Sequence, residues 1–205
     1  MRDGLRPRPV GPRALLVEVD SAEHAAALAG WARARRDRLG EVGEIVPAAR
    51  TVLFDEVAEP HRLRTVLAGW SPSAAVPAGP LVELPTSYDG PDLADVARLW
   101  HVDEAEVVAR HTGVELVAAF CGFAPGFAYL TGLPAEWAVP RLDSPRARVP
   151  AGSVGLAGTY CGVYPTASPG GWRLLGRTEA PLWDLARDEP ALLAPGTRVR
   201  FTKAP

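Results

Sequence analysis

The 205-residue chain contains only two cysteines, Cys121 and Cys161, so it lacks the cysteine framework of a disulfide-stabilised fold. Its four histidines are scattered along the chain and show none of the spacings typical of zinc ligands. We therefore expect no metal site. The two cysteines are expected to be small buried groups in a reducing compartment.

The sequence also lacks a surplus of either charge, because 22 Lys and Arg face 24 Asp and Glu for a net charge of −2. Proteins that bind DNA or RNA usually carry a strong basic surplus, so we expect no nucleic-acid partner. No apolar run approaches the length of a membrane span. Residues 1–13 are basic but lack the apolar core and cleavage site of a secretory signal. These features predict a soluble, cytoplasmic protein that contacts no membrane.

Several catalytic signatures are missing as well. The sequence has no P-loop, no dinucleotide-binding fingerprint, no nucleophile elbow and no zinc-protease helix. Glycine and proline, in contrast, are abundant, with 20 and 21 residues. Such a composition indicates many turns and short strands in at least part of the chain.

The first third of the sequence alternates between strand and helix patterns, which predicts a small α/β domain over residues 1–82. Ser21 is placed to cap the first helix, and its alanine-rich stripe is placed for burial. The order of the expected elements is that of a ferredoxin-like βαββαβ domain. These elements are a strand at 14–19, a helix from Ala22 to about Arg38, strands at 44–49 and 50–57, a helix from Pro60 through Trp70 and, after a loop at 71–80, a strand at 81–85.

The remainder, residues 83–205, begins with two helices and then changes character. Asp92 is the expected N-cap of a helix at Leu93–Trp100, and Asp103 that of a second helix reaching about His111. Short β-prone runs separated by glycine and proline follow, at 115–120, 153–157, 173–176 and 198–202. We expect a compact β-sandwich or β-barrel here, which makes the whole chain an α+β protein.

A loop at 122–127 reads Gly-Phe-Ala-Pro-Gly-Phe and combines flexible glycines with aromatic side chains. Glycine permits a positive φ and close approach of the backbone to a ligand. Phe123, Phe127 and Tyr129 can form an apolar wall of a binding site. The alternative is a tight turn whose aromatic rings fill the core.

Three arginines, Arg141, Arg146 and Arg148, lie within one short stretch. If Arg146 and Arg148 occupy a strand, they project from the same face, because side chains alternate along a strand. Two adjacent guanidinium groups suit a carboxylate or a phosphate. The alternative is that they form ion pairs with Asp143 and other surface acids.

His111 stands at the end of its predicted helix, where it can act as a general base, stabilise the helix terminus or be merely exposed. Further along, Ser168–Trp172 forms a second glycine-rich turn, and Arg177 adds another cation. Trp172 can equally anchor the core of the barrel.

Taken together, seven segments resemble the family of the 5-oxoprolinase B subunit, which is also called allophanate hydrolase subunit 1 or the sporulation-kinase-inhibitor family. The resemblance covers about residues 14–203 and is most specific in the second half. The segments are Tyr-Asp-Gly-Pro-Asp-Leu at 88–93, Glu-Val-Val-x-x-His at 106–111, Gly-Phe-Ala-Pro-Gly-Phe-Ala-Tyr-Leu at 122–130, Pro-Arg-Ala-Arg-Val-Pro-Ala-Gly-Ser-Val-Gly at 145–155, Val-Tyr-Pro at 163–165, Ser-Pro-Gly-Gly-Trp at 168–172 and Gly-Arg-Thr at 176–178.

The resemblance implies a ferredoxin-like N-terminal domain and a cyclophilin-like β-barrel. It also implies a homologous partner, the C subunit of 5-oxoprolinase, and a third subunit, which together open the amide ring of 5-oxoproline to glutamate at the expense of ATP. Related domains form the carboxyltransferase part of urea carboxylase, which uses carboxybiotin. The only methionine here is Met1, so the chain lacks the Met-Lys-Met signature of a biotin carrier.

Within this family, we expect the catalytic roles to fall to His111, Arg146 and Arg148. The arginines would hold anionic groups, and the histidine would support or relay a proton. The expected substrate-binding residues are Gly122, Phe123, Pro125, Gly126, Phe127, Tyr129, Arg141, Pro150, Ser153 and Tyr160.

One segment departs from the family pattern, and two other functions compete with the enzyme. The family typically reads Gly-Asn-Gln-Thr-Gly where residues 158–162 read Gly-Thr-Tyr-Cys-Gly. The chain thereby loses an amide and a hydroxyl side chain and gains Tyr160, and this change affects which substrate is expected. The alternatives are a regulatory protein that inhibits a sensor histidine kinase and an allophanate- or urea-type carboxyltransferase subunit. Prolyl isomerase activity is disfavoured, because a shared fold does not carry function.

Overall fold

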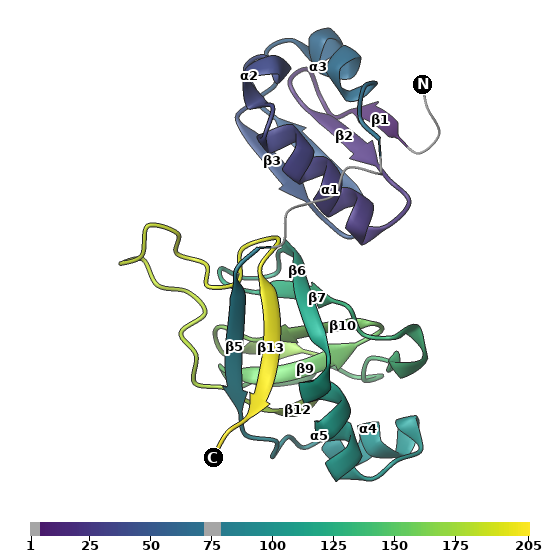
Figure 1. Cartoon of the computed structure of the whole chain (residues 1–205), viewed down its shortest axis with the longest axis vertical. Helices are drawn as coiled ribbons and strands as arrows, with labels where there is room; N and C mark the ends of the chain where they lie inside the picture. The colour runs from purple at the N-terminus through teal and green to yellow at the C-terminus, as the bar shows by residue number, and fades with distance from the viewer. Residues whose placement is uncertain (1–4, 72–78) are drawn as a thin grey trace. The chain divides into compact units, whose positions relative to one another are not determined.

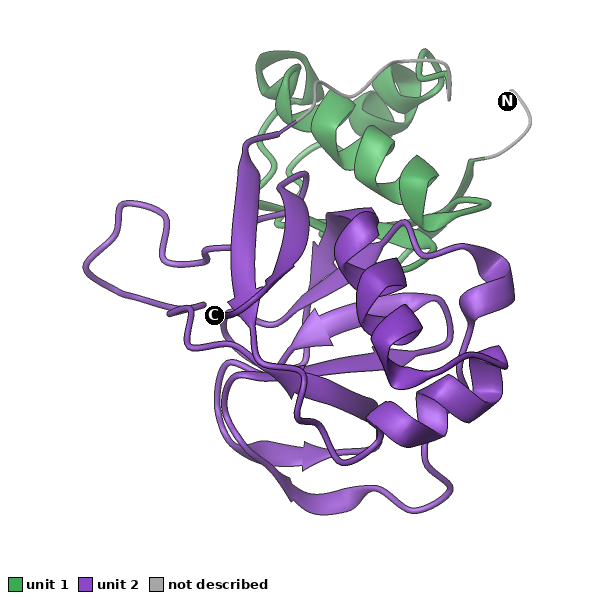
Figure 2. Cartoon of the chain, turned by 60° about the horizontal axis from the view of Figure 1, so that its bottom comes forward, with its two compact units in different colours: residues 1–78 green, residues 79–205 purple. Residues whose placement is uncertain are grey.

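The computed structural model describes residues 5–71 and 79–205, and the chain divides into two compact units, 1–78 and 79–205 (Figure 2). Each unit has its own hydrophobic core. The domain boundary expected after residue 82 falls inside strand β5 (Leu81–Thr86). The loop expected at 71–80 lies mostly outside the described residues.

The described residues of the first unit, 5–71, form a four-stranded antiparallel sheet and three helices. Helix α1 (Ala22–Arg33) contacts β3 (Glu44–Pro47) and β4 (Thr51–Asp55). Its buried side chains confirm the expected stripe of Ala25, Leu28, Ala29 and Ala32. In spatial order the strands are β1 (Arg6–Pro9), β2 (Leu15–Glu18), β4 (Thr51–Asp55) and β3 (Glu44–Pro47), and the helices are α1 (Ala22–Arg33), α2 (Arg36–Leu39) and α3 (Pro60–Leu67).

Helix α1 begins as expected but ends early. The Ser21 hydroxyl accepts a hydrogen bond from the backbone N–H of His24 at 3.2 Å, which confirms the cap. The helix ends at Arg33, and the short α2 follows as a separate helix. Arg33 and Arg36 donate to the carbonyl groups of Ile45 and Val42, at 2.8 and 2.6 Å. These contacts with residues 42–45 hold the turn that interrupts the single helix predicted to reach Arg38.

The predicted strand at 81–85 exists, but its assignment to the first domain is wrong. Strand β5 pairs in parallel with β13 (Arg198–Lys203) in the second unit, where Leu84 and Phe201 enter the same core. In the first sheet, β1 takes the edge position beside β2 instead. Pro7 and Pro9 suit an edge, because proline has no N–H to offer a further strand.

The second unit is built on a seven-stranded sheet that curves into a barrel, as Figure 1 shows. Its edge strands β12 and β5 meet where Ser87 and Arg177 exchange two backbone hydrogen bonds of 2.9 Å each. The α+β class is therefore confirmed. The spatial order is β12 (Arg173–Arg177), β9 (Ser153–Ala157), β10 (Tyr160–Val163), β7 (Ala128–Thr131), β6 (Glu115–Cys121), β13 and β5, and β8 (Arg146–Val149) pairs separately with β11 (Ser168–Gly170).

Helices α4 (Leu93–Trp100) and α5 (Glu104–Gly113) pack together, with α4 against β12 and α5 against β13 (Figure 1). The Asp103 carboxylate accepts from the backbone N–H of Glu106 at 2.8 Å, which confirms its cap. Asp92 precedes α4 as expected, but its side chain does not cap the helix. None of the described helices is long or apolar enough to cross a membrane.

Candidate functional site

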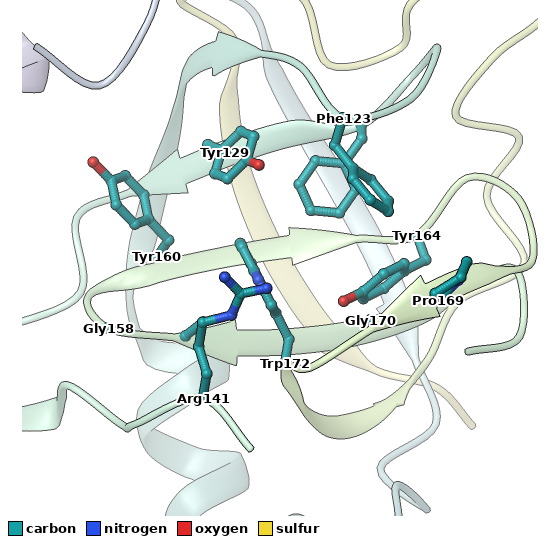
Figure 3. Close-up of a pocket in the computed structure, with 11 residues that line it drawn as sticks. Phe123, Tyr129, Arg141, Gly158, Tyr160, Tyr164, Pro169, Gly170 and Trp172 are labelled. Atoms are coloured by element: carbon teal, nitrogen blue, oxygen red, sulfur yellow. The ribbon is translucent and has the colours of Figure 1, made fainter. Parts of the chain in front are cut away.

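One face of the barrel carries a cavity of about 250 Å³ with a mostly aromatic lining (Figure 3). A volume this small suits a molecule of amino-acid size, since drug-sized ligands occupy about 300–1,000 Å³. The lining consists of Phe123, Phe127, Tyr129, Arg141, Ala157, Gly158, Tyr160, Tyr164, Pro169, Gly170 and Trp172.

The strands place these residues by simple alternation. Along β10, Tyr160 faces the cavity, whereas Cys161 points into the barrel core. Gly162 lies under the aromatic rings, because a Cβ atom there would come 2.9 Å from Cζ of Phe127 and 3.1 Å from Cζ3 of Trp172. Because Gly162 has no side chain, the rings of Phe127 and Trp172 can pack directly against β10.

Phe127 is the centre of the aromatic cluster. Its ring makes edge-to-face contacts with Phe123, Tyr129, Tyr164 and Trp172, with centroids 5.0 to 5.5 Å apart. Such pairs stabilise by about 0.5–1.5 kcal/mol each beyond the area they bury. The cluster therefore forms a rigid wall rather than a set of independently mobile rings.

The loop that supplies Phe123 has an unusual backbone. Phe123 has a φ of 69°, a left-handed conformation that costs a residue with a Cβ atom about 1–2 kcal/mol. Its side chain is nevertheless 59% exposed at the cavity rim. Gly126 has a φ of 85° and sits so close to Trp183 that a Cβ atom would approach that side chain to 2.9 Å. The strained, exposed aromatic residue is typical of a functional loop.

Arg141 is the one cation among the described residues that line the cavity. Figure 3 shows its guanidinium group beside Trp172, with the hydroxyl of Tyr164 turned toward the same region. Burial raises the pKa of Tyr164, while the backbone of Trp172 and the charges of Arg141 and Arg146 act on that pKa in the opposite direction. The Tyr164 hydroxyl thus stays protonated and can donate a hydrogen bond at neutral pH.

The other two arginines of this stretch lie outside the cavity lining. Nη2 of Arg146 lies 2.7 Å from Oδ1 of Asp92, and its Nη1 donates to the carbonyl of Trp172 at 3.3 Å. The second carboxylate oxygen of Asp92 accepts from the backbone N–H of Leu174 at 2.7 Å. Arg148 is exposed on β8 and forms no salt bridge within the described residues. Asp92, rather than Asp143, is thus the partner of Arg146.

His111 lies in the core of the barrel, with none of its surface exposed. Its Nδ1 is 2.7 Å from the Tyr88 hydroxyl, its Nε2 is 3.4 Å from Sγ of Cys161, and its ring centroid is 4.5 Å from that of Phe201. Burial lowers the pKa of His111 to about 3. The ring is therefore neutral at pH 7, and it contacts the core-facing side of β10 rather than the cavity.

The structure brings together five of the residues predicted to form the site: Phe123, Phe127, Tyr129, Arg141 and Tyr160. The remaining predicted residues lie outside the lining: Gly122, Pro125, Gly126, Pro150, Ser153, His111, Arg146 and Arg148. Sequence reasoning missed Tyr164 and left Trp172 as a possible core residue. The Ser168–Trp172 turn was the available signal, since Pro169, Gly170 and Trp172 all line the cavity.

Within residues 5–71 and 79–205, no group of three or more His, Cys, Asp or Glu side chains is placed to hold a metal ion.

The family model described as carboxyltransferase domain, subdomain C and D, matches residues 5–193. The chain belongs to this carboxyltransferase family. The cavity and the residues that form it all lie inside the matched region.

Members of the carboxyltransferase family with curated names agree with the sequence resemblance. The chain is 51% identical over 136 residues to the 5-oxoprolinase B subunit of Escherichia coli O157:H7, a match covering 64% of this chain and 62% of that protein. It is 44% identical over 126 residues to the 5-oxoprolinase B subunit of Bacillus subtilis (strain 168), covering 60% and 52%. The match thus spans less than two thirds of the length of either relative.

Among solved structures, that of TTHA0988 superposes with a TM-score of 0.79 at 33% identity. The superposition covers 95% of this chain and 40% of TTHA0988. The likeness therefore includes nearly all of this chain, and the longer protein contains a further region that this chain does not match.

Proposed function

We propose that this chain is a 5-oxoprolinase-type subunit whose aromatic cavity binds a small cyclic amide. In this proposal it acts with a homologous C subunit and a third subunit, and the complex opens 5-oxoproline to glutamate with consumption of ATP. The family match and the relatives named as B subunits of 5-oxoprolinase support the reaction class. The cavity supports the location of the substrate.

The composition of the cavity lining is the observation that carries the proposal. Among the described residues that line it, none is an acid, a histidine, a lysine, a cysteine or a serine. General acid–base and nucleophilic catalysis draw mainly on those residue types. Tyr164 is a weak substitute, because burial raises its pKa. The cavity is equipped to bind and orient a ring, and the reacting groups would come from another subunit.

The cavity does not fit ATP. A triphosphate is usually held by a glycine-rich backbone cradle at a helix N-terminus, together with a lysine and a magnesium ion. Here the lining offers a single guanidinium group, and its remaining walls are largely aromatic. We therefore assign ATP to another part of the complex. In that arrangement this subunit positions the amide carbonyl while a partner activates it.

The test is reconstitution of the chain with its cognate C subunit and third subunit, with glutamate formation measured with and without ATP. A Tyr160→Leu variant removes a half-buried ring from the cavity lining. We expect it to raise KM for 5-oxoproline while thermal unfolding stays close to wild type. A KM for 5-oxoproline that is unchanged in this variant would contradict the location of the substrate.

The same reconstitution separates the competing functions. An assembled, folded complex that forms no glutamate from 5-oxoproline would overturn the proposed reaction. Carboxyl transfer from carboxybiotin to urea would then favour a urea-type carboxyltransferase subunit. Inhibition of a sensor histidine kinase by the chain alone would favour the regulatory alternative.

A further inference from the structure

We propose that Arg141 and the Tyr164 hydroxyl form an anion-binding end of the aromatic cavity, which selects a small planar ring that carries one carboxylate. The proposal deepens the proposed function, on which it rests for the identity of the ring as a cyclic amide. It differs from the sequence expectation, which placed the anion at Arg146 and Arg148.

Arg141 differs from two neighbouring arginines in what its charge contacts. Arg146 is paired with Asp92, and Nη1 of Arg173 lies 3.2 Å from Oδ2 of Asp95. Both of these cations are therefore already neutralised by carboxylates of the α4 region. Arg141, in contrast, forms no salt bridge with any described residue. Its charge is available to a ligand in the cavity that it lines.

The backbone around Arg141 is held on both sides. Nε of Arg173 donates to the carbonyl of Pro140 at 3.0 Å. The backbone N–H of Leu142 donates to the carbonyl of Gly171 at 2.8 Å. These two bonds tie the segment to the residues on either side of Trp172, so the guanidinium group reaches the cavity from a fixed base (Figure 3). A preorganised donor loses less conformational entropy when it binds an anion.

The Tyr164 hydroxyl completes the anion-binding end. Figure 3 shows it turned toward the region of the Arg141 guanidinium group, and both side chains line the same cavity. The neutral phenol carries a proton that it can donate to a ligand oxygen. One carboxylate can thus receive a guanidinium group and a phenol, which are charge-assisted donors of the strong class.

The rest of the lining defines the remainder of the ligand. Phe127, Tyr129 and Trp172 present apolar ring faces and edges, and these accommodate a flat ring better than a branched or charged chain. The cavity volume of about 250 Å³ limits the ligand to roughly the size of an amino acid. A five-membered lactam with a carboxylate combines these properties.

The test measures binding of two matched ligands to the full chain by isothermal titration calorimetry. 5-Oxoproline carries the carboxylate, and 2-pyrrolidinone is the same ring without it. Arg141→Met removes the proposed anion donor, and Arg148→Met is the control, because Arg148 is an exposed arginine outside the lining. Tyr164→Phe removes only the hydroxyl.

We expect Arg141→Met to weaken binding of 5-oxoproline by about 10- to 100-fold, the loss of one charge-assisted interaction. Binding of 2-pyrrolidinone should change by less than about 2-fold, because that ligand has no anion to lose. Tyr164→Phe should act in the same direction with a smaller effect, and Arg148→Met should leave both ligands unaffected. Each variant should unfold at nearly the wild-type temperature.

Equal weakening of both ligands by Arg141→Met would overturn the proposal, since a general distortion would then explain the loss. An effect of Arg148→Met as large as that of Arg141→Met would also overturn it, as would wild-type protein that binds neither ligand. The proposed function is tested separately by glutamate formation. A complex that hydrolyses 5-oxoproline with an unchanged KM in Arg141→Met refutes the anion site alone, whereas selective carboxylate binding without turnover refutes the reaction alone.

Discussion

The Tyr88 hydroxyl lies 2.7 Å from Nδ1 of His111, inside the barrel core. With Tyr88 donating, the proton of the neutral ring resides on Nε2, which then donates toward the Cys161 sulfur at 3.4 Å. Burial lowers the pKa of His111 and raises the pKa of both Tyr88 and Cys161, so all three groups are neutral at pH 7. Three segments distant in sequence are joined by this uncharged chain of hydrogen bonds.

The buried His111 predicts that the protein loses stability in mild acid. In the unfolded chain the imidazole takes up a proton near pH 6.5, whereas in the folded chain it does so only near pH 3. Between these values the unfolded state binds more protons, so the free energy of unfolding falls as the pH is lowered, by about 1.4 kcal/mol per pH unit from this group. Above pH 6.5 the imidazole is neutral in both states, so His111 no longer makes the free energy of unfolding depend on pH.

Urea unfolding of wild type and His111→Gln at pH 7, 6 and 5 measures this effect. We expect the variant to be less stable at pH 7 by about 1–3 kcal/mol, because Tyr88 or Cys161 loses its buried partner. The difference should shrink as the pH falls, since the variant lacks the titrating group. A difference that is the same at all three pH values would contradict the assignment.

The Asp92 carboxylate links α4, β8 and β12, and we expect its removal to be costly. It is 4% exposed and accepts hydrogen bonds from Arg146 and from the backbone of Leu174. Asp92→Ala should lower the free energy of unfolding by about 3 kcal/mol, the lower end for a broken buried pair, because Arg146 keeps some contact with water.

The control for this measurement is Asp89→Ala, which breaks the exposed pair between Asp89 and Arg177. Exposed pairs contribute less than about 1 kcal/mol, so chemical denaturation should show a small loss. Equal losses in the two variants would mean that Asp92 contributes no more than a surface charge.

Gly162 supports the cavity, and we expect a methyl group there to disturb both stability and binding. In Gly162→Ala the new Cβ atom would come 2.9 Å from Phe127 and 3.1 Å from Trp172, so the rings must shift. The expected cost is about 1–3 kcal/mol in the free energy of unfolding, together with weaker binding of 5-oxoproline.

Gly113→Ala is the matched control, because nothing lies within 4 Å of a Cβ atom at this position. There the substitution should be neutral or stabilise by about 0.4–1 kcal/mol, since it restricts the unfolded chain. Thermal unfolding and calorimetry on both variants give the comparison. Undisturbed binding in Gly162→Ala would show that the rings are free to rearrange.

Two substitutions at Phe123 separate the effect of backbone strain on stability from the effect of the aromatic ring on ligand binding. Phe123→Gly and Phe123→Ala both remove the exposed ring at the rim, so both should bind 5-oxoproline more weakly than wild type. Only glycine relieves the left-handed backbone, whose φ is 69°. We expect the glycine variant to be more stable than the alanine variant by about 1 kcal/mol in urea unfolding. The reverse order would mean that the loop changes conformation when the ring is lost.

Most elements of the fold could be predicted because their signals are local. Ser21 and Asp103 each bond to a backbone N–H three residues ahead, so the sequence window that predicts the cap also contains its partner. The helix at Leu93–Trp100 was also predicted, although the side chain of Asp92, its expected cap, bonds to Arg146 and to the backbone of Leu174 instead. The place of β5 could not be predicted, because its partner β13 lies more than a hundred residues further along the chain.

The candidate site likewise divides into features with local sequence signals and features that depend on distant residues. The sequence by itself determined the family and the glycine–aromatic loop at 122–127, because both are written in contiguous residues. It favoured Arg146 and Arg148 over Arg141 as the pair that holds an anion, and it left His111 at a helix end. Only the tertiary structure decided that Arg146 meets Asp92, that His111 is enclosed with Tyr88 and Cys161, and that Arg141 faces the aromatic cavity. The reason is physical: the state of a charged side chain depends on burial and on partners that folding brings from far along the chain.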